Sequence, residues 1–502
     1  MAAGLLRVAS EEEAAAFLRA TAGRGIPVLP QAARSSLTGG AIPRGEVILS
    51  VEPMSGIGPL GTRPGEGTIA VQAGVRLKDL QRVVGERGFY YPPVPTYQEA
   101  MIGGTVSTNA GGAASFKYGV TRDWVDGLRV VLANGDVLEL RRGEACAARG
   151  GSFRIVLSDG SVLEVPTPDY VLPALKKVSA GYYASDPMDL VDLFVGSEGT
   201  LGLITEITVR LVALPVAALT TLVFLGSCEE AISLATSLRA EAARSRTDPS
   251  HPDVRAIESM DAESLDLLRK HGDTRRLRVS VPERARVALL LEIELAEAVS
   301  TADALALLER VVERRDSTRG PLARFFQILH VHGALLDMEL ALPGDEHRQE
   351  ALHEFRESVP RRVNEILSAR RREDPEVKKV GGDLIVPFER LGEMIRIYEE
   401  GFRCRRLPFA IWGHLSDGNL HPNALPRNAA EVASGIEAML QFGMEALRRG
   451  GAPLSEHGVG RSPLKQELLR RFLGEEAIGT MRRIKSALDP EGRFAPGVLF
   501  RP

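Results

Sequence analysis

The sequence Ile-Gly-Gly-Thr-Val-Ser-Thr-Asn-Ala-Gly-Gly, residues 102–112, decides the class of fold. Two further stretches are equally rich in small and hydroxyl-bearing residues, Gln-Ala-Ala-Arg-Ser-Ser-Leu-Thr-Gly-Gly at 31–40 and Gly-Ser-Glu-Gly-Thr-Leu-Gly at 196–202. Small residues let the backbone approach a bulky anion, and consecutive N–H groups in turns form a concavity that binds anions. Each stretch alone also fits an ordinary loop between strands, but the three together predict a site for a dinucleotide pyrophosphate. A Rossmann site is not indicated, because no Gly-x-Gly-x-x-Gly follows a predicted strand and opens a helix.

The composition is that of an ordinary globular protein with two or three domains. The chain has 502 residues, of which 44% are hydrophobic and 25% charged, and its formal net charge of −4 argues against a nucleic-acid partner. The three cysteines, Cys146, Cys228 and Cys404, are too widely spaced to suggest a disulfide framework or a zinc knot. We expect a cytoplasmic protein, since the first residues lack the apolar region of a secretory signal and no apolar run is long enough to span a membrane.

Periodicity and turn signals predict a mixed first part and a second part of strands alternating with long charged helices. In the first part we expect a helix capped by Ser10, strands at 25–30, 47–51 and 68–73, a helix at 77–87, and hairpins at 130–140 and 155–165. In the second part we expect a strand at 287–293 and helices at 301–314 and 347–372, with the sheet covered on one face, and a basic helix at 477–488 closes the chain.

Two short motifs carry candidate chemistry. In His-Leu-Ser-Asp-Gly-Asn-Leu-His, residues 414–421, a two-residue turn at Asp417-Gly418 would set His414 directly opposite His421, which suits two ligands of one divalent metal. An ordinary hairpin is the alternative. In Ser-Glu-His-Gly-Val-Gly, residues 455–460, Glu456 could be a third ligand and His457 a base. Three of the 9 histidines fall in these two motifs, which favours the functional interpretation.

The order of these motifs resembles the FAD domain of the vanillyl-alcohol oxidase/p-cresol methylhydroxylase superfamily. Within it, the chain is most similar to the group of D-lactate dehydrogenase, the glycolate oxidase flavin subunit and D-2-hydroxyglutarate dehydrogenase, over nearly its whole length. The resemblance implies an α+β protein, with a two-subdomain FAD-binding domain at 1–213 and an α+β substrate or cap domain with an antiparallel sheet at 214–450. A C-terminal segment at 451–502 would complete the active site and pack on the FAD domain.

The resemblance also implies which residues bind the cofactor. Those expected to contact FAD are Ala32, Ala33, Arg34, Ser35, Ser36, Leu37, Pro95, Thr96, Gly103, Gly104, Ser107, Thr108, Asn109, Gly111, Glu198, Gly202 and Ile204. The flavin is expected to be non-covalent, because no histidine or cysteine precedes Cys146. The chain departs from the family where Gln31 to Arg34 replace several glycines and where Ala495 replaces asparagine. The role of Arg34, toward the phosphates or toward solvent, stays open.

The catalytic residues follow from the same resemblance. His414, His421 and Glu456 would ligate a divalent metal, expected to be zinc, His457 would be the general base, and Asn423 would contact substrate or flavin. Arg356 is expected to bind the substrate carboxylate; the alternative is that it is merely an exposed arginine on a helix. Lys379 is the second expected cation, and Lys378 is equally suitable. Pro360, in place of a threonine in glutarate-type enzymes, favours a monocarboxylate.

These residues predict FAD-dependent oxidation of a D-2-hydroxy acid, with D-lactate or glycolate favoured. The alternatives are a non-redox FAD synthase of the alkyl-dihydroxyacetone-phosphate type and an accessory flavin subunit of a glycolate oxidase complex. The electron acceptor stays open among a quinone, a cytochrome, an electron-transfer flavoprotein and oxygen. Peripheral contact with a membrane and a homodimer also stay open.

Overall fold

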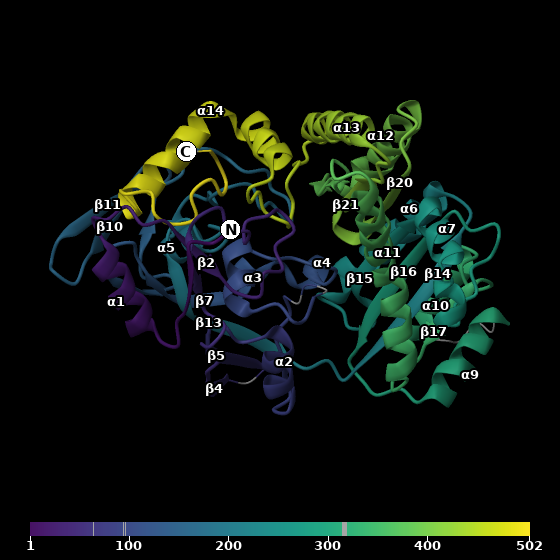
Figure 1. Ribbon diagram of the computed structural model, residues 1–502. Helices are drawn as coiled ribbons and strands as arrows, with labels where there is room; N and C mark the ends of the chain where they lie inside the picture. Colours follow the sequence, from purple (N-terminus) through teal and green to yellow (C-terminus); the bar gives the residue numbers. More distant parts are fainter. Residues whose placement is uncertain (64, 94, 96, 314–318, 502) are drawn as a thin grey trace. The chain divides into compact units, whose positions relative to one another are not determined.

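The computed structural model describes residues 1–63, 65–93, 95, 97–313 and 319–501. The chain forms two compact units, whose elements are labelled in Figure 1. Unit 1 contains residues 1–112, 119–214 and 452–502, and unit 2 contains residues 113–118 and 215–451. The α+β class expected from the sequence is confirmed.

Unit 1 contains two main sheets and the helices that flank them. A parallel sheet has the order β1-β3-β2, from Gly4–Arg7, Val47–Ser50 and Val28–Gln31. An antiparallel sheet has the order β4-β5-β13-β7-β8, from Ile57–Arg63, Glu66–Gln72, Leu203–Ala213, Val125–Val131 and Val137–Arg141, and β6 (Phe89–Tyr90) also pairs with β13. Short strands β9 (Cys146–Ala147) and β12 (Met188–Asp189) pair with each other. The helices are α1 (Glu11–Thr21), α2 (Leu77–Gly85), α3 (Ile102–Thr108), α5 (Leu190–Phe194) and α14 (Pro463–Leu488).

The local signals at the start of unit 1 are confirmed. Ser10 caps α1, because its hydroxyl accepts a hydrogen bond from the Glu13 N–H, and three acidic residues occupy the first turn. The C-terminal helix is longer than expected: α14 begins at Pro463, and a break at Gly474 (φ 82°, ψ 169°) separates the predicted basic helix from the turns before it.

Both predicted hairpins of unit 1 form. Strands β7 and β8 pair around Asn134-Gly135, and β10 (Ser152–Val156) pairs with β11 (Val162–Pro166) around Asp159-Gly160. Gly135 and Gly160 have nearly the same left-handed φ, 84° and 83°. They differ in surroundings, because a methyl group on Gly135 would lie 2.6 Å from the Ala15 carbonyl of α1, whereas Gly160 has nothing within 4 Å.

Unit 2 is built on an antiparallel sheet. Its strands have the order β17-β14-β16-β15-β20-β21-β18, from Met338–Ala341, Ala217–Leu225, Val287–Leu295, Asp253–Asp261, Phe409–His414, Asn419–Ala424 and Val380–Gly381, with β19 (Leu384–Ile385) also paired to β21. The helices are α4 (Ser115–Tyr118), α6 (Cys228–Ser245), α7 (Ala262–Lys270), α8 (Asp273–Arg276), α9 (Thr301–Val312), α10 (Pro321–Val331), α11 (Glu346–Glu373), α12 (Leu391–Cys404) and α13 (Ala429–Arg448).

The expectation that this sheet is covered on one face was wrong. Successive residues along β14 and β16 are buried, so both faces of the central strands are shielded from water. One face shares a core with α7 and α11, in which Phe224, Leu290 and Phe355 take part. Helix α6 contacts the same strands. The apolar run at 287–293 is typical of a strand buried on both sides.

Among the described residues, no helix combines the length and apolar character needed to cross a bilayer.

The two hairpin glycines provide a matched test of how α1 packs on unit 1. Gly160→Ala should lower the free energy of unfolding by about 1 kcal/mol, the cost of a left-handed alanine. Gly135→Ala should cost at least about 1 kcal/mol more, because its methyl group also collides with α1. Urea unfolding midpoints of the two variants measure the difference, and equal midpoints would contradict the close packing of Gly135 on α1.

Candidate functional site

The three small-residue stretches come together within unit 1. The Gly196 N–H donates to the Val106 carbonyl at 2.9 Å, and the Glu198 N–H donates to the Ser107 carbonyl at 2.7 Å. A methyl group on Gly104 would lie 3.4 Å from the Ala32 methyl, so the first stretch also lies against α3. The three loops therefore lie close together, and Gly104, which has no side chain, faces Ala32. This is the close backbone approach expected of a dinucleotide site.

The other predicted cofactor residues differ in their exposure and in their contacts. The stretch from Ala32 to Leu37 is partly to fully exposed, and Arg34 takes a left-handed φ of 60°. In and after α3, the hydroxyls of Ser107 and Thr108 donate to the Gly103 and Gly104 carbonyls. Asn109 is left-handed and accepts from the Arg122 N–H, whereas Gly111 and Pro95 are half-buried. Gly202 and Ile204 are buried at the start of β13. Thr96 lies outside the described residues.

Glu198 holds the turn that follows the Glu456-His457 motif. Its carboxylate accepts hydrogen bonds from the N–H groups of Val459 at 2.7 Å and Gly460 at 2.8 Å. Burial raises the pKa of Glu198 to about 7, although these two donors act in the opposite direction. The third small-residue stretch and the C-terminal motif are therefore joined by a carboxylate that titrates near neutral pH.

Glu456 is held by a buried lysine of unit 1. Lys177 Nζ lies 2.8 Å from Glu456 Oε2, and the two side chains are 0% and 7% exposed. His457 is more accessible, with Nε2 at 3.8 Å from Glu456 Oε1. The motif thus presents a buried carboxylate and a half-buried imidazole whose ligand atoms lie within 4.8 Å of each other.

The hairpin that carries the other two histidines differs from the prediction. A 3₁₀ turn at Leu415–Asp417 and a left-handed Gly418 make the loop four residues long, so His414 pairs with Asn419 and His421 pairs with Trp412. The predicted direct pairing of the histidines was therefore wrong. Their predicted common face is confirmed, because the register shift is two residues and the side-chain period of a strand is two. The two rings meet edge to face with centroids 5.3 Å apart.

The surroundings of the two histidines consist of buried charged groups of unit 2. His414 Nδ1 lies 2.5 Å from Glu258 Oε1, and Arg356 lies 2.7 Å from Glu258 Oε2. His421 Nδ1 lies 3.7 Å from Asp383 Oδ1. Arg356 is buried, contrary to the alternative of an exposed helical arginine. The sheet face beside α11 therefore changes along its length from an apolar core to a cluster of ionisable groups.

Lys379 and Asn423 belong to the same region of unit 2. Lys379 Nζ donates to Asn364 Oδ1 on α11 at 3.2 Å and lies 5.8 Å from the centre of the Trp412 ring. Burial of its ammonium group among protein atoms lowers the pKa of Lys379 to about 8, although much of the side chain is exposed. Asn423 is buried on β21 and donates to the His421 carbonyl. The alternative, Lys378, is also exposed.

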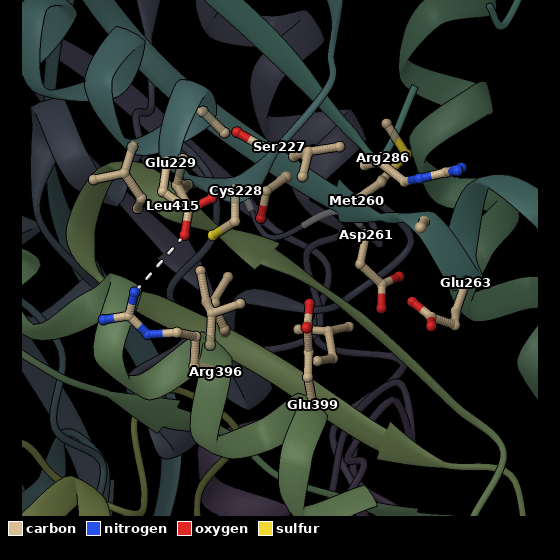
Figure 2. Close-up of a pocket in the computed structure, with 18 of the residues that line it drawn as sticks. Ser227, Cys228, Glu229, Met260, Asp261, Glu263, Arg286, Arg396, Glu399 and Leu415 are labelled. Carbon is tan, nitrogen blue, oxygen red and sulfur yellow. Dashed lines mark ion pairs between the residues drawn. The ribbon is translucent and has the colours of Figure 1, made fainter. Parts of the chain in front are cut away.

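A separate cavity of about 270 Å³ in unit 2 is lined by the starts of α6 and α7 and by α12. Figure 2 shows the carboxylates of Asp261 and Glu263 directed toward each other in this cavity. Burial, reinforced by the Glu263 charge, raises the pKa of Asp261 well above its usual range, and burial raises the pKa of Cys228 to about 12. A thiol with that pKa stays protonated and unreactive at neutral pH. None of the predicted site residues lines this cavity in the described part of the chain.

Three partners of predicted residues escaped the sequence analysis: Lys177 in unit 1, and Glu258 and Asp383 in unit 2. Each contacts a predicted residue far away along the chain; Glu258 is separated from His414 by 156 residues and Lys177 from Glu456 by 279. An isolated lysine or glutamate carries no local signal. The one available signal was an acid inside an apolar strand, as at Glu258, because such an acid needs a buried partner.

Comparisons with known proteins agree with this architecture. The family model of the FAD binding domain matches residues 2–141, and that of the C-terminal domain of FAD linked oxidases matches residues 220–499. Mitochondrial D-2-hydroxyglutarate dehydrogenase of Bos taurus is 31% identical over 501 residues, which cover 98% of this chain and 76% of that protein. Glycolate oxidase subunit GlcD of Bacillus subtilis is 28% identical, covering 95% and 84%. D-lactate dehydrogenase of Anaerostipes hadrus is 26% identical, covering 99% and 89%.

A solved structure of alkyldihydroxyacetonephosphate synthase has the same fold, with a TM-score of 0.58 at 16% identity over 98% of this chain and 75% of that one. The chain belongs to the FAD-linked oxidases of the vanillyl-alcohol oxidase/p-cresol methylhydroxylase family. The resemblance expected from the sequence is thereby confirmed, as is an FAD-binding domain in the first part of the chain.

The residues present fit both expected groups. The loops around α3 provide small residues and backbone donors for a dinucleotide, as described above. Imidazole nitrogens and carboxylate oxygens are ligands that suit zinc, and the Glu258 carboxylate contacts Nδ1 of His414. Asp383 and His421 likewise offer ligand atoms within 4.8 Å of each other. That His414, His421 and Glu456 share one ion stays a prediction.

Removing Lys177 tests the buried pair. Lys177→Met should lower the free energy of unfolding by about 3–5 kcal/mol, because it leaves the Glu456 carboxylate buried without its cation. Lys177→Met/Glu456→Gln should recover most of that loss, since neither charge remains. Urea unfolding of the single and double variants measures both effects, and a single variant as stable as the wild type would contradict the pair.

Glu198 should make stability fall as pH rises. Its pKa is about 7 in the folded protein against a usual 4.5, so its contribution is complete below pH 4.5 and is lost as pH rises through 7. Between pH 5 and pH 8 the wild type should lose up to about 3 kcal/mol relative to Glu198→Gln. Urea midpoints across this range measure the change. Exposed Glu66→Gln is the control, and a wild type that tracks Glu198→Gln at every pH would refute the raised pKa.

Proposed function

We propose that the protein is an FAD-dependent dehydrogenase that oxidises a D-2-hydroxy acid to the 2-oxo acid, with D-lactate or glycolate as the favoured substrate. The observation that carries the proposal is the cluster in unit 2, where His414, His421, Arg356 and Asn423 are buried on one face of the sheet. Relatives named for glycolate, D-2-hydroxyglutarate and D-lactate support the same class of substrate.

The substrate carboxylate needs positive charge, which Arg356 and Lys379 supply. Both terminal nitrogens of Arg356 already lie 2.7 Å from a carboxylate, one from Glu258 and the other from Glu357. Lys379 hydrogen-bonds to the uncharged Asn364, so its charge is better available to a substrate. Pro360 lies one helical turn beyond Arg356 and offers no hydroxyl to a second carboxylate, which favours a monocarboxylate.

Removal of the proton from the substrate hydroxyl is assigned to His457. Its imidazole is half-buried, and a neutral imidazole can act as a general base. Asn423 is held by the His421 carbonyl and is assigned to substrate or flavin contact. When bound, FAD supplies the hydride acceptor and a divalent metal, with His414, His421 and Glu456 as proposed ligands, supplies the charge that acidifies the hydroxyl.

Anaerobic reduction of the bound flavin tests this proposal. D-lactate, L-lactate, glycolate and D-2-hydroxyglutarate are added separately, and one D-acid or glycolate should bleach the visible flavin band. His457→Gln should slow that reduction by about 10²- to 10⁴-fold, since general-base catalysis is lost.

The exposed His271 provides the matched control, and His271→Gln should reduce at the wild-type rate. A bound flavin that none of the acids reduces would refute the dehydrogenase and favour a non-redox synthase or an accessory subunit. Reduction by D-2-hydroxyglutarate alone would refute the preference for a monocarboxylate.

A further inference from the structure

Glu258 is the shared partner of a proposed metal ligand and a proposed substrate-binding cation. It lies on β15 directly opposite His414 in the β15–β20 register. One carboxylate oxygen contacts His414 Nδ1 at 2.5 Å and the other contacts Arg356 at 2.7 Å. The side chains of Glu258, His414 and Arg356 are each at most 7% exposed, so these contacts form out of reach of bulk water.

The contact with His414 determines which ring nitrogen carries the proton. A carboxylate that accepts a hydrogen bond from Nδ1–H holds the imidazole in the tautomer whose lone pair is on Nε2. It also fixes the ring orientation and raises the basicity of Nε2. In this protein the contact therefore places the His414 proton on Nδ1 and the lone pair on Nε2 before a metal binds.

The contact with Arg356 connects the same carboxylate to α11. Arg356 is a long side chain with several rotamers, and the Glu258 carboxylate fixes one end of its guanidinium while Glu357 contacts the other. Moving Arg356 would take a cation away from the buried Glu258 carboxylate, and moving His414 would take away one of its hydrogen-bond donors, so either movement is costly. The positions of the two groups are thus mechanically coupled through one residue.

We propose that Glu258 is a positioning residue that sets the tautomer and orientation of His414 for metal binding and fixes Arg356 in register with it. The inference rests on the proposed function only for the roles of His414 and Arg356. Glu258 itself is not assigned to contact substrate or flavin.

Glu292 offers a matched control on the neighbouring strand β16. It lies 2.7 Å from His353 and 3.5 Å from Arg255, so it makes the same kind of carboxylate contacts with an imidazole and an arginine. Its side chain is 14% exposed, and neither of these partners is a predicted site residue. Glu292→Gln therefore reports the cost of neutralising a carboxylate on this sheet without touching His414.

The experiment compares zinc binding by the FAD-loaded wild type, Glu258→Gln and Glu292→Gln. Zinc dissociation constants are measured by competition with a chromophoric chelator, together with FAD stoichiometry and thermal unfolding. Glu258→Gln should weaken zinc binding about 10- to 100-fold, as expected for loss of a partner of a metal-bound histidine. Glu292→Gln should stay within about twofold of the wild type, and all three should retain FAD.

A second measurement needs no variant at Glu258 and so remains valid if Glu258→Gln fails to fold. Long-range ¹H–¹⁵N spectra of histidine-labelled wild type, with the His414 signal assigned through His414→Gln, report the ring tautomer. Before zinc is added, His414 should be protonated on Nδ1. Protonation on Nε2 would overturn the inference.

The outcomes separate this inference from the proposed function. Unchanged zinc affinity in Glu258→Gln overturns the inference even if a hydroxy acid bleaches the wild-type flavin. Weakened zinc binding in Glu258→Gln supports it even if no hydroxy acid bleaches the flavin, and in that case only the proposed oxidation fails. A wild type that binds no zinc overturns the inference, while flavin bleaching still decides the oxidation independently.

Discussion

A charge can be buried only beside a group that compensates it, and this constraint fixes the side chains that carry the candidate chemistry in each unit. In unit 2 the Glu258 carboxylate serves His414 and Arg356 together. In unit 1 the fully buried Lys177 holds Glu456. Because each group is restrained by its partner rather than by local backbone alone, the imidazoles and carboxylates keep defined orientations inside the protein.

Backbone conformation shows what two departures from the family pattern cost in strain. Arg34 stands where the resemblance leads one to expect glycines, and Ala495 stands where asparagine is usual. Both residues have a left-handed φ, 60° and 42°, a region that glycine and asparagine adopt most readily. The chain therefore keeps the conformation and accepts roughly 1–2 kcal/mol of strain at each site. At Ala495 the hydrogen bond from its N–H to the Val28 carbonyl, 2.8 Å long, helps to hold that conformation.

The relatives narrow the class of substrate, and the side chains of this chain bear on which member of that class is preferred. The named relatives act on glycolate, D-2-hydroxyglutarate and D-lactate, acids that share a hydroxyl beside a carboxylate and differ in what lies beyond it. The proposed function assigns the shared part to the histidines, Glu456 and Asn423 of this chain. The same proposal assigns the variable part to α11, where Arg356 is already compensated and Pro360 adds no polar group, and to Lys379 with its uncharged partner. The proposed substrate preference therefore depends on few side chains.

The sequence by itself determined the features that arise from neighbours along the chain. The capped start of α1, both hairpins and the common face of His414 and His421 follow from short-range hydrogen bonding and from the two-residue period of a strand. The three small-residue stretches and the histidine motifs together were specific enough to identify the family.

Tertiary structure alone decided the exact register of the histidine hairpin, the burial of both faces of the central sheet and the partners of the site residues. The 3₁₀ turn at Leu415–Asp417 lengthened a loop that Asp417-Gly418 would otherwise have closed in two residues. The contacts of Glu258 and Lys177 join residues more than 150 positions apart. Such contacts form only when separate strands and loops pack together, and no local pattern encodes which carboxylate meets which cation.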